Sequence, residues 1–277
     1  LFLISLLHIS QPNREVFLFD LNSTNGKLEL SNFKNISNNE GYDNQPSFLD
    51  DSTILFASTR NGQTDILEYT ISNGNKKWLC NTEGGEYSPL KIPNQNAISA
   101  IRLDTDGKQL LYRYDIETGM SKPLMDTLVV GYHAWFDKNT IVSSVLEGDI
   151  LSVYVSNLET HKNRKMDENV GRSLHKIPKS NLVSYISKKT TIWTINALNP
   201  LSGDIKFIAN TLPKTEDMVW LNATTILMGK GNKIYKFNIK TDTNWVELAS
   251  LQDNNINNIT RLALSHNRKK LAVVGEL

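Results

Sequence analysis

The sequence predicts an all-β protein, a six-bladed β-propeller with four-stranded antiparallel blades, and three observations support this prediction. A short pattern recurs, in which an aromatic or apolar residue precedes a polar turn and a β-rich apolar run. These runs begin 44, 43, 41, 44 and 45 residues apart, at Ile54, Ile98, Ile141, Leu182, Ile226 and Leu271. No stretch of helical length with a 3.6-residue apolar period interrupts the repeat. A period of about 40–45 residues with several short strands is typical of propeller blades.

Each interval contains the same order of predicted elements. In the first, the initial hairpin precedes a third strand at residues 65–71, a polar turn at 72–75 and a fourth strand at 77–80. Glycine, asparagine and aspartate favour such turns because they tolerate left-handed backbone conformations. The same order predicts further third strands from Gln109, Leu151, Ile192 and Lys233. The basic run at residues 161–165 and the lysine pairs 188–189 and 269–270 are expected in turns.

The last blade is predicted to be shared by the two ends of the chain, so that residues 11–277 form one propeller domain. Leu271 opens a second strand, while Val16–Asn22 and Lys27–Asn32 resemble the third and fourth strands of the other blades. We therefore expect Val16–Asn22 to lie beside Leu271–Val274. This pairing would close the ring and cover strand edges that would otherwise be exposed.

One blade carries a resemblance to a known family. Its matching residues are Pro46, Phe48, Ile54, Phe56, Ser58, Arg60, Gly62, Asp65 and Ile66. This stretch resembles the repeat of the TolB-like propellers, also called WD40-like PD40 repeats. The resemblance implies a six-bladed propeller that binds ligands at the mouth of a central channel. We also expect Arg60 to order its own blade through a hydrogen-bonded pair with Asp65.

Aligning the blades on their repeat markers nominates six residues that line the channel mouth. These candidate ligand-binding residues are Gln45, Tyr132, His133, His175, Asp217 and Arg261. In this alignment two histidines share one register on neighbouring blades, and Asp217 lies one residue earlier on the next blade. Imidazole and carboxylate groups suit manganese, iron or zinc, so metal binding is one interpretation. Polar lining of a wet channel is the other, and we assign no metal, cofactor or catalytic residue.

Composition and motifs narrow the function classes. With 30 basic and 29 acidic side chains the net charge is +1, which disfavours a strongly basic nucleic-acid binder. The sequence contains no phosphate-binding glycine loop and no G-x-S-x-G nucleophile motif. The single cysteine, Cys80, is expected as a buried thiol at the end of an outer strand. Trp135 and Trp220 occupy the inner-strand aromatic position and are expected to wedge between blades.

We therefore expect a non-enzymatic propeller that binds a protein partner or a small ligand at the channel mouth. Two alternatives stay open: a metal-assisted saccharide lyase or hydrolase at the same mouth, and a structural partner in an envelope assembly. The apolar run Leu1–Ile9 is similar to the core of an export signal, so residues 1–10 are expected to be a signal remnant. An extra apolar strand is the other interpretation of this run. Export predicts a periplasmic or cell-surface location, with no membrane span in the mature chain.

Overall fold

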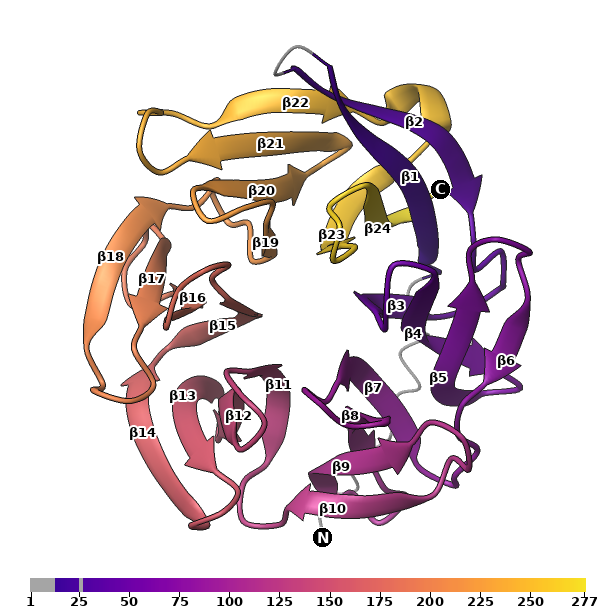
Figure 1. Cartoon of the computed structure of the whole chain (residues 1–277), viewed down its shortest axis with the longest axis vertical. Helices are drawn as coiled ribbons and strands as arrows, with labels where there is room; N and C mark the ends of the chain where they lie inside the picture. Colours follow the sequence, from indigo (N-terminus) through magenta and orange to yellow (C-terminus); the bar gives the residue numbers. More distant parts are fainter. Residues whose placement is uncertain (1–12, 25–26) are drawn as a thin grey trace, which may run out of the picture.

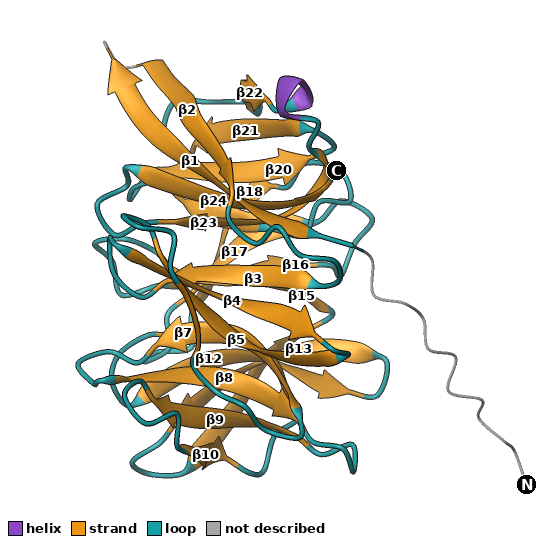
Figure 2. Cartoon of the chain, turned by 90° about the vertical axis from the view of Figure 1, so that its right-hand side faces the viewer, coloured by secondary structure: helices purple, strands orange, loops and turns teal. Residues whose placement is uncertain are grey.

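Six four-stranded antiparallel sheets stand around a central axis in the computed structural model of the chain, which describes residues 13–24 and 27–277 (Figure 1). Each sheet is one blade, and its strands run in chain order from the channel outward in five of the six. The predicted fold class, a six-bladed β-propeller, is therefore confirmed. In the side view of Figure 2 the blades are seen edge-on.

The strands are grouped into blades as follows. Blade 1 comprises β3 (Asp43–Phe48), β4 (Thr53–Arg60), β5 (Gln63–Thr70) and β6 (Lys76–Trp78). Blade 2 comprises β7 (Gly85–Lys91), β8 (Ala97–Leu103), β9 (Gln109–Asp115) and β10 (Ser121–Met125). Blade 3 comprises β11 (Val130–Trp135), β12 (Thr140–Glu147), β13 (Ile150–Asn157) and β14 (Lys162–Glu168). Blade 4 comprises β15 (Val170–Lys176), β16 (Val183–Ser187), β17 (Thr194–Leu198) and β18 (Ile205–Asn210). Blade 5 comprises β19 (Met218–Trp220), β20 (Thr225–Lys230), β21 (Lys233–Asn238) and β22 (Val246–Ser250).

Blade 6 is built from both ends of the chain. Its strand order is β2 (Lys27–Asn35), β1 (Glu15–Thr24), β24 (Lys270–Glu276) and β23 (Asn257–Leu264). Val16 pairs with Val274 and Phe19 with Leu271, so the predicted closure is confirmed. A short 3₁₀ helix, η1 (Gln252–Asn254), precedes β23.

The hydrophobic core lies between adjacent blades. One cluster joins Val16 and Val274 of blade 6 to Phe48 and Ile54 of blade 1. Each sheet thus buries both faces against its neighbours, which explains why second strands such as β4 and β12 are buried along almost their whole length.

Two tryptophans fill the same position at two different blade junctions. Trp135 on β11 donates its indole N–H to Ser99 Oγ on β8 of the preceding blade, at 2.8 Å. Trp220 on β19 donates to Ser184 Oγ on β16 at the same distance. The expected wedging between blades is therefore present, and in both cases a serine satisfies the buried indole N–H.

Strand pairing corrects one repeat marker. The last residue of the innermost strand pairs with Ile54, Ile98, Ile141, Ile226 and Leu271 in five blades, as expected, but with Val183 in blade 4. The predicted marker, Leu182, instead accepts the N–H of Ile177 and closes the turn. The stretch between Lys176 and Val183 is one residue longer than the equivalent stretch of blades 1, 3 and 5, so positions on β15 lie one residue further from the marker.

Other local expectations also change. Lys162–Lys165 begin the outermost strand β14, and Lys270 begins β24, so these basic residues are not all in turns. An outermost strand exposes one face to water, so a run of charged residues fits it as well as a turn. The third strand of blade 4 starts at Thr194, and Ile192 before it is exposed.

The expected signal remnant at residues 1–10 lies outside the described residues. Within the described part of the chain, no helix is long and apolar enough to cross a membrane.

Candidate binding site at the central channel

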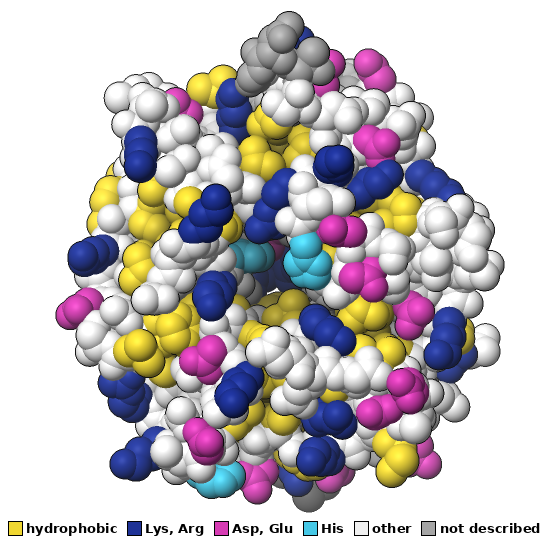
Figure 3. Space-filling model, in the orientation of Figure 1, with side chains coloured by type: hydrophobic (Ala, Val, Ile, Leu, Met, Phe, Trp, Pro, Cys, Tyr) yellow, Lys and Arg dark blue, Asp and Glu magenta, His cyan; other side chains and the backbone are white. Residues whose placement is uncertain are grey.

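A ring of six side chains, one from each blade, surrounds the central channel. Each ring residue stands three positions before the last paired residue of an innermost strand. The channel ring consists of Gln45, Ser88, Tyr132, Ser173, Asp217 and Arg261, and all six line one cavity of about 100 Å³. Figure 3 shows a hollow at the centre of the disc, with histidine side chains and basic side chains beside it.

All six residues nominated from the sequence line this cavity. Gln45, Tyr132, Asp217 and Arg261 belong to the channel ring itself. His133 lies one residue further along β11, and His175 lies two residues further along β15. The expectation that the two histidines share one register is therefore wrong, because the stretch between Lys176 and Val183 is one residue longer than that between Trp135 and Ile141.

Burial keeps the two histidines neutral. His133 is buried, a hydrogen bond of 2.7 Å joins its Nε2 to Ser99 Oγ, and burial lowers its pKa to about 3. Burial, followed by the nearby Arg268, lowers the pKa of His175 to about 4. Neither histidine forms a metal-ligating group with Asp217. Within residues 13–24 and 27–277, one group of three potential metal ligands has donor atoms close together, and it lies outside the channel. The expected ligand set for a metal-assisted reaction in the channel is thus not assembled.

Asp217 and two arginines form the charged side of the channel. The Asp217 carboxylate accepts the N–H of Leu262 at 2.8 Å and lies 3.9 Å from Arg261 Nη1. Burial raises the pKa of Asp217, while Arg261 and then Arg172 oppose this shift. The guanidinium of Arg261 also lies 5.6 Å from the ring centre of Tyr132, within reach of a cation–π interaction.

Arg172 is a channel residue that the sequence analysis missed. It stands one position before the channel ring on β15 and donates from Nη2 to the carbonyl of Thr260 at 3.0 Å. Its signal was present in the sequence, because a count of nine residues back from Leu182, as from Ile54 to Gln45, reaches the position directly after this arginine. The same count identifies Ser173 as the ring residue of blade 4.

Several ring side chains tie neighbouring blades together. Gln45 Oε1 accepts the N–H of Ser88, and Ser173 Oγ accepts the N–H of Met218, at 2.9 and 3.2 Å. Asp217 likewise accepts the N–H of Leu262, so three ring residues each satisfy a backbone N–H group of the next innermost strand. These residues therefore have a structural role in addition to any contact with a ligand.

Four buried polar atoms around the channel lack a hydrogen-bond partner among the described residues. They are Ser88 Oγ, His133 Nδ1, Arg172 Nε and Thr260 Oγ1. An unsatisfied buried donor or acceptor costs about 1–3 kcal/mol. A ligand or water molecule that bonds to them would recover this free energy, so the channel wall is suited to binding a polar group.

Two larger pockets open beside the channel ring. The first, of about 430 Å³, is lined largely by aromatic and aliphatic side chains of blades 2 and 3, including Tyr87, Tyr132, Leu146, Ile150 and Leu151. We call it the apolar pocket. The second, of about 470 Å³, is lined by blades 4 to 6 and includes Arg172, Lys214, Glu216, Asp217 and Lys230. We call it the charged pocket.

Both pockets lie on the same face of the ring. Each is bordered by the start of an innermost strand and by the hairpin between the second and third strands of a blade, near Gly148 and near Gly231. The apolar pocket shares Gln45 and Tyr132 with the channel cavity, and the charged pocket shares Arg172 and Asp217. The three hollows therefore form one continuous lining across the channel mouth.

Six four-stranded blades around a central channel define the chain as a six-bladed β-propeller. No family model matches it, and no curated protein matches it either. Solved structures do match. The structure described as the putative TolB from Agrobacterium tumefaciens has a TM-score of 0.72 and 11% identity, covering 96% of this chain and 98% of that one. The chain thus has the fold of a TolB-like propeller.

Enzymes share this fold as well. A gluconolactonase from Xanthomonas campestris matches with a TM-score of 0.65 and 11% identity, covering 97% of this chain and 98% of that one. An oligogalacturonate lyase in complex with manganese matches with a TM-score of 0.60 and 12% identity, over 94% of this chain and 86% of that one. At such low identity the likeness defines the fold, and function must be argued from the site.

Proposed function

We propose that the protein is a non-enzymatic binding propeller that takes a protein segment or a small ligand at the mouth of its central channel. The observation that supports this proposal most directly is the continuous lining that joins the apolar pocket, the channel ring and the charged pocket. It offers an aromatic and aliphatic surface on one side and guanidinium and ammonium groups on the other.

The state of the titratable groups favours binding over proton transfer. A general acid or base works best with a pKa near the operating pH, whereas the pKa of His133 is about 3 and that of His175 about 4. The Asp217 carboxylate already accepts a hydrogen bond from the backbone N–H of Leu262 and pairs with the guanidinium of Arg261. The groups that remain free to contact a ligand are mainly hydrogen-bond donors.

The charges indicate which ligand fits. The charged pocket combines Arg172, Lys214 and Lys230 with Glu216 and Asp217, and Arg261 lies beside it in the channel. The basic groups outnumber the acidic ones, so a ligand with an apolar part and at least one carboxylate would match the lining. An extended peptide segment has both features.

A selection from random peptides tests this proposal. We expect the purified protein to enrich peptides that combine an aromatic or large aliphatic residue with an acidic one. A Tyr132→Ala, Arg172→Gln double variant should bind the enriched peptides at least tenfold more weakly in calorimetric titrations, as expected for an aromatic and an arginine anchor. Tyr235→Ala, on the third strand of blade 5, is the matched control and should change affinity less than twofold.

Two results would count against the proposal. One is the absence of any enriched peptide, and the other is equal affinity of the channel double variant and the parent. A stoichiometric partner that binds the parent and the double variant equally would instead favour the structural role in an envelope assembly.

We further propose export of the protein, on the basis of the apolar run at residues 1–9, and cell fractionation of the full-length protein tests it.

A further inference from the structure

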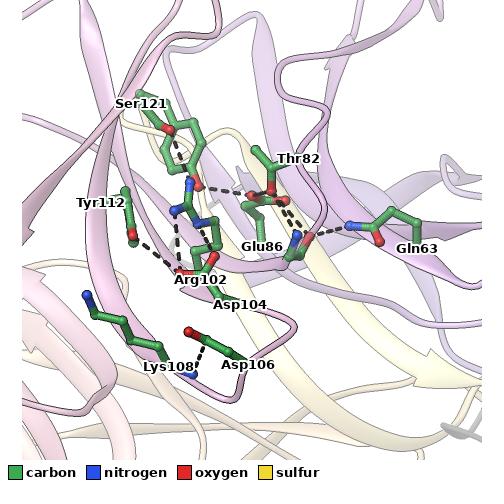
Figure 4. A network of polar contacts seen from close by, with 11 residues as sticks. Gln63, Thr82, Glu86, Arg102, Asp104, Asp106, Lys108, Tyr112 and Ser121 are labelled. Atoms are coloured by element: carbon green, nitrogen blue, oxygen red, sulfur yellow. Dashed lines mark hydrogen bonds and ion pairs between the residues drawn. The ribbon is translucent and has the colours of Figure 1, made fainter.

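Three buried side chains converge at the junction of blades 1 and 2, away from the channel. Asp65 on β5 and Glu86 on β7 are 0% exposed, and Cys80, which follows β6, is 5% exposed. One donor atom from each of the three lies within 4.8 Å of the others. Figure 4 shows Glu86 in this region, with Thr82 beside it.

The preceding junction, between blades 6 and 1, has an equivalent arrangement with one difference. There Ser37 stands six residues before Asp43, as Cys80 stands six residues before Glu86. The N–H of Val16 donates to Ser37 Oγ at 2.7 Å, and the N–H of Ile66 donates to Cys80 Sγ at 3.5 Å. The cysteine therefore occupies the position that a serine holds at the preceding junction.

This exchange changes how the carboxylates are satisfied. At the first junction the hydroxyl of Ser37 donates a hydrogen bond to Glu15, and one carboxylate oxygen, Asp43 Oδ1, has no partner among the described residues. At the second, Asp65 Oδ1 and Glu86 Oε2 are buried and have no hydrogen-bond partner among the residues that the structure describes.

The other oxygen of each carboxylate is held by the protein. Asp65 Oδ2 lies 3.4 Å from Arg60 Nη2, which confirms the expected pair in this blade. Glu86 Oε1 accepts hydrogen bonds from Thr82 and, at 3.0 Å, from Tyr114. Each carboxyl group is thus fixed in position by one oxygen, while its second oxygen is free to bind.

We propose that Asp65, Cys80 and Glu86 form a binding site for one divalent transition-metal ion, with zinc as the best match. One thiolate and two carboxylate oxygens are a ligand set that zinc accepts, at bond lengths of about 2.0–2.3 Å. An ion would satisfy the two free oxygens together. It would also join blade 1 to blade 2, because Asp65 on β5 and Cys80 after β6 belong to blade 1 and Glu86 on β7 belongs to blade 2.

The local charges are consistent with an ion that replaces protons. Burial raises the pKa of the Cys80 thiol. Burial, followed in smaller part by the neighbouring Asp65, raises the pKa of Glu86 to about 7. A divalent cation would balance the charge that these groups acquire on deprotonation, and their protons would be released to solvent.

Cobalt titration of the tag-free, chelator-treated full chain tests the proposal. Cys80 is the only cysteine in the sequence, so a cobalt–thiolate charge-transfer band can come from no other side chain. We expect one equivalent of Co²⁺ to produce this band and one equivalent of Zn²⁺ to abolish it. Metal is added both to the native protein and during refolding, since the three ligands are buried.

Three variants locate the ion. Cys80→Ser restores the residue of the equivalent junction, so it should fold but lose the band and bind Zn²⁺ at least tenfold more weakly. Glu86→Gln should weaken Co²⁺ binding at least tenfold, whereas Asp43→Asn at the equivalent junction should leave it unchanged. The proposal is overturned if the parent shows no band under either condition, or if Glu86→Gln binds Co²⁺ as tightly as the parent.

Discussion

Replacement of Trp220 by alanine should lower the free energy of unfolding by about 3–5 kcal/mol, the usual range for removing a large buried aromatic side chain. Trp220 is 2% exposed and packs against Ile186 and Ile195 of blade 4 as well as Ile226 of its own blade. The truncation would leave a cavity at a blade junction and remove the partner of Ser184 Oγ. Urea unfolding followed by fluorescence and circular dichroism measures the loss.

Trp245→Ala provides the matched control for this experiment. Trp245 is only partly buried, at the outer side of blade 5, and its indole N–H donates to the carbonyl of Asn210. Its replacement should cost clearly less, and peptide binding at the channel should survive in both variants. A Trp220→Ala protein as stable as the parent would contradict the wedge between blades 4 and 5.

Acidification from pH 7 to pH 5 should remove roughly 2 kcal/mol of stability for each of His133 and His175. Burial lowers their pKa values from 6.5 to about 3 and about 4, so the unfolded chain takes up protons first as the pH falls. The stability that these neutral histidines contribute is present above pH 6.5. It is lost progressively as the pH falls toward their pKa values in the folded state.

Comparison of variants isolates this effect from other titrating groups. Asp43 acts in the opposite direction, because burial raises its pKa to about 6 and acidification therefore relieves a penalty. His133→Asn should lose about 2 kcal/mol less than the parent between pH 7 and pH 5, whereas His161→Asn, in an exposed turn, should behave like the parent. Equal pH dependence of the parent and His133→Asn would contradict a neutral, buried His133.

The repeat spacing was enough to predict the fold because each blade is a sequence-local unit with hydrogen-bonded hairpins of nearly constant length. The channel ring was harder to predict. A slip of one residue moves a side chain to the other face of a strand, and stretches that are one residue longer in blades 2 and 4 than in blades 1, 3 and 5 caused such slips. These slips hid Ser88 and Ser173 and placed His175 in the wrong register.

Irregular pairing added to this difficulty. Register shifts interrupt the innermost strands at the level of the channel ring, for example between Asn44 and Ser47 and between Tyr87 and Leu90. Such bulges redirect side chains without leaving a pattern in the sequence. The group of Asp65, Cys80 and Glu86 was missed for another reason, since its members meet only when two blades pack together.

The closure of blade 6 has a consequence for how the protein folds. Blades 1 to 5 can each form from one contiguous stretch of chain, whereas Glu15 must meet Gly275 before the ring is complete. Bringing together such distant partners carries a large loop-closure entropy and slows folding. During synthesis one edge of β1 therefore stays unpaired until β24 has left the ribosome. The pairing of these two strands then completes the ring.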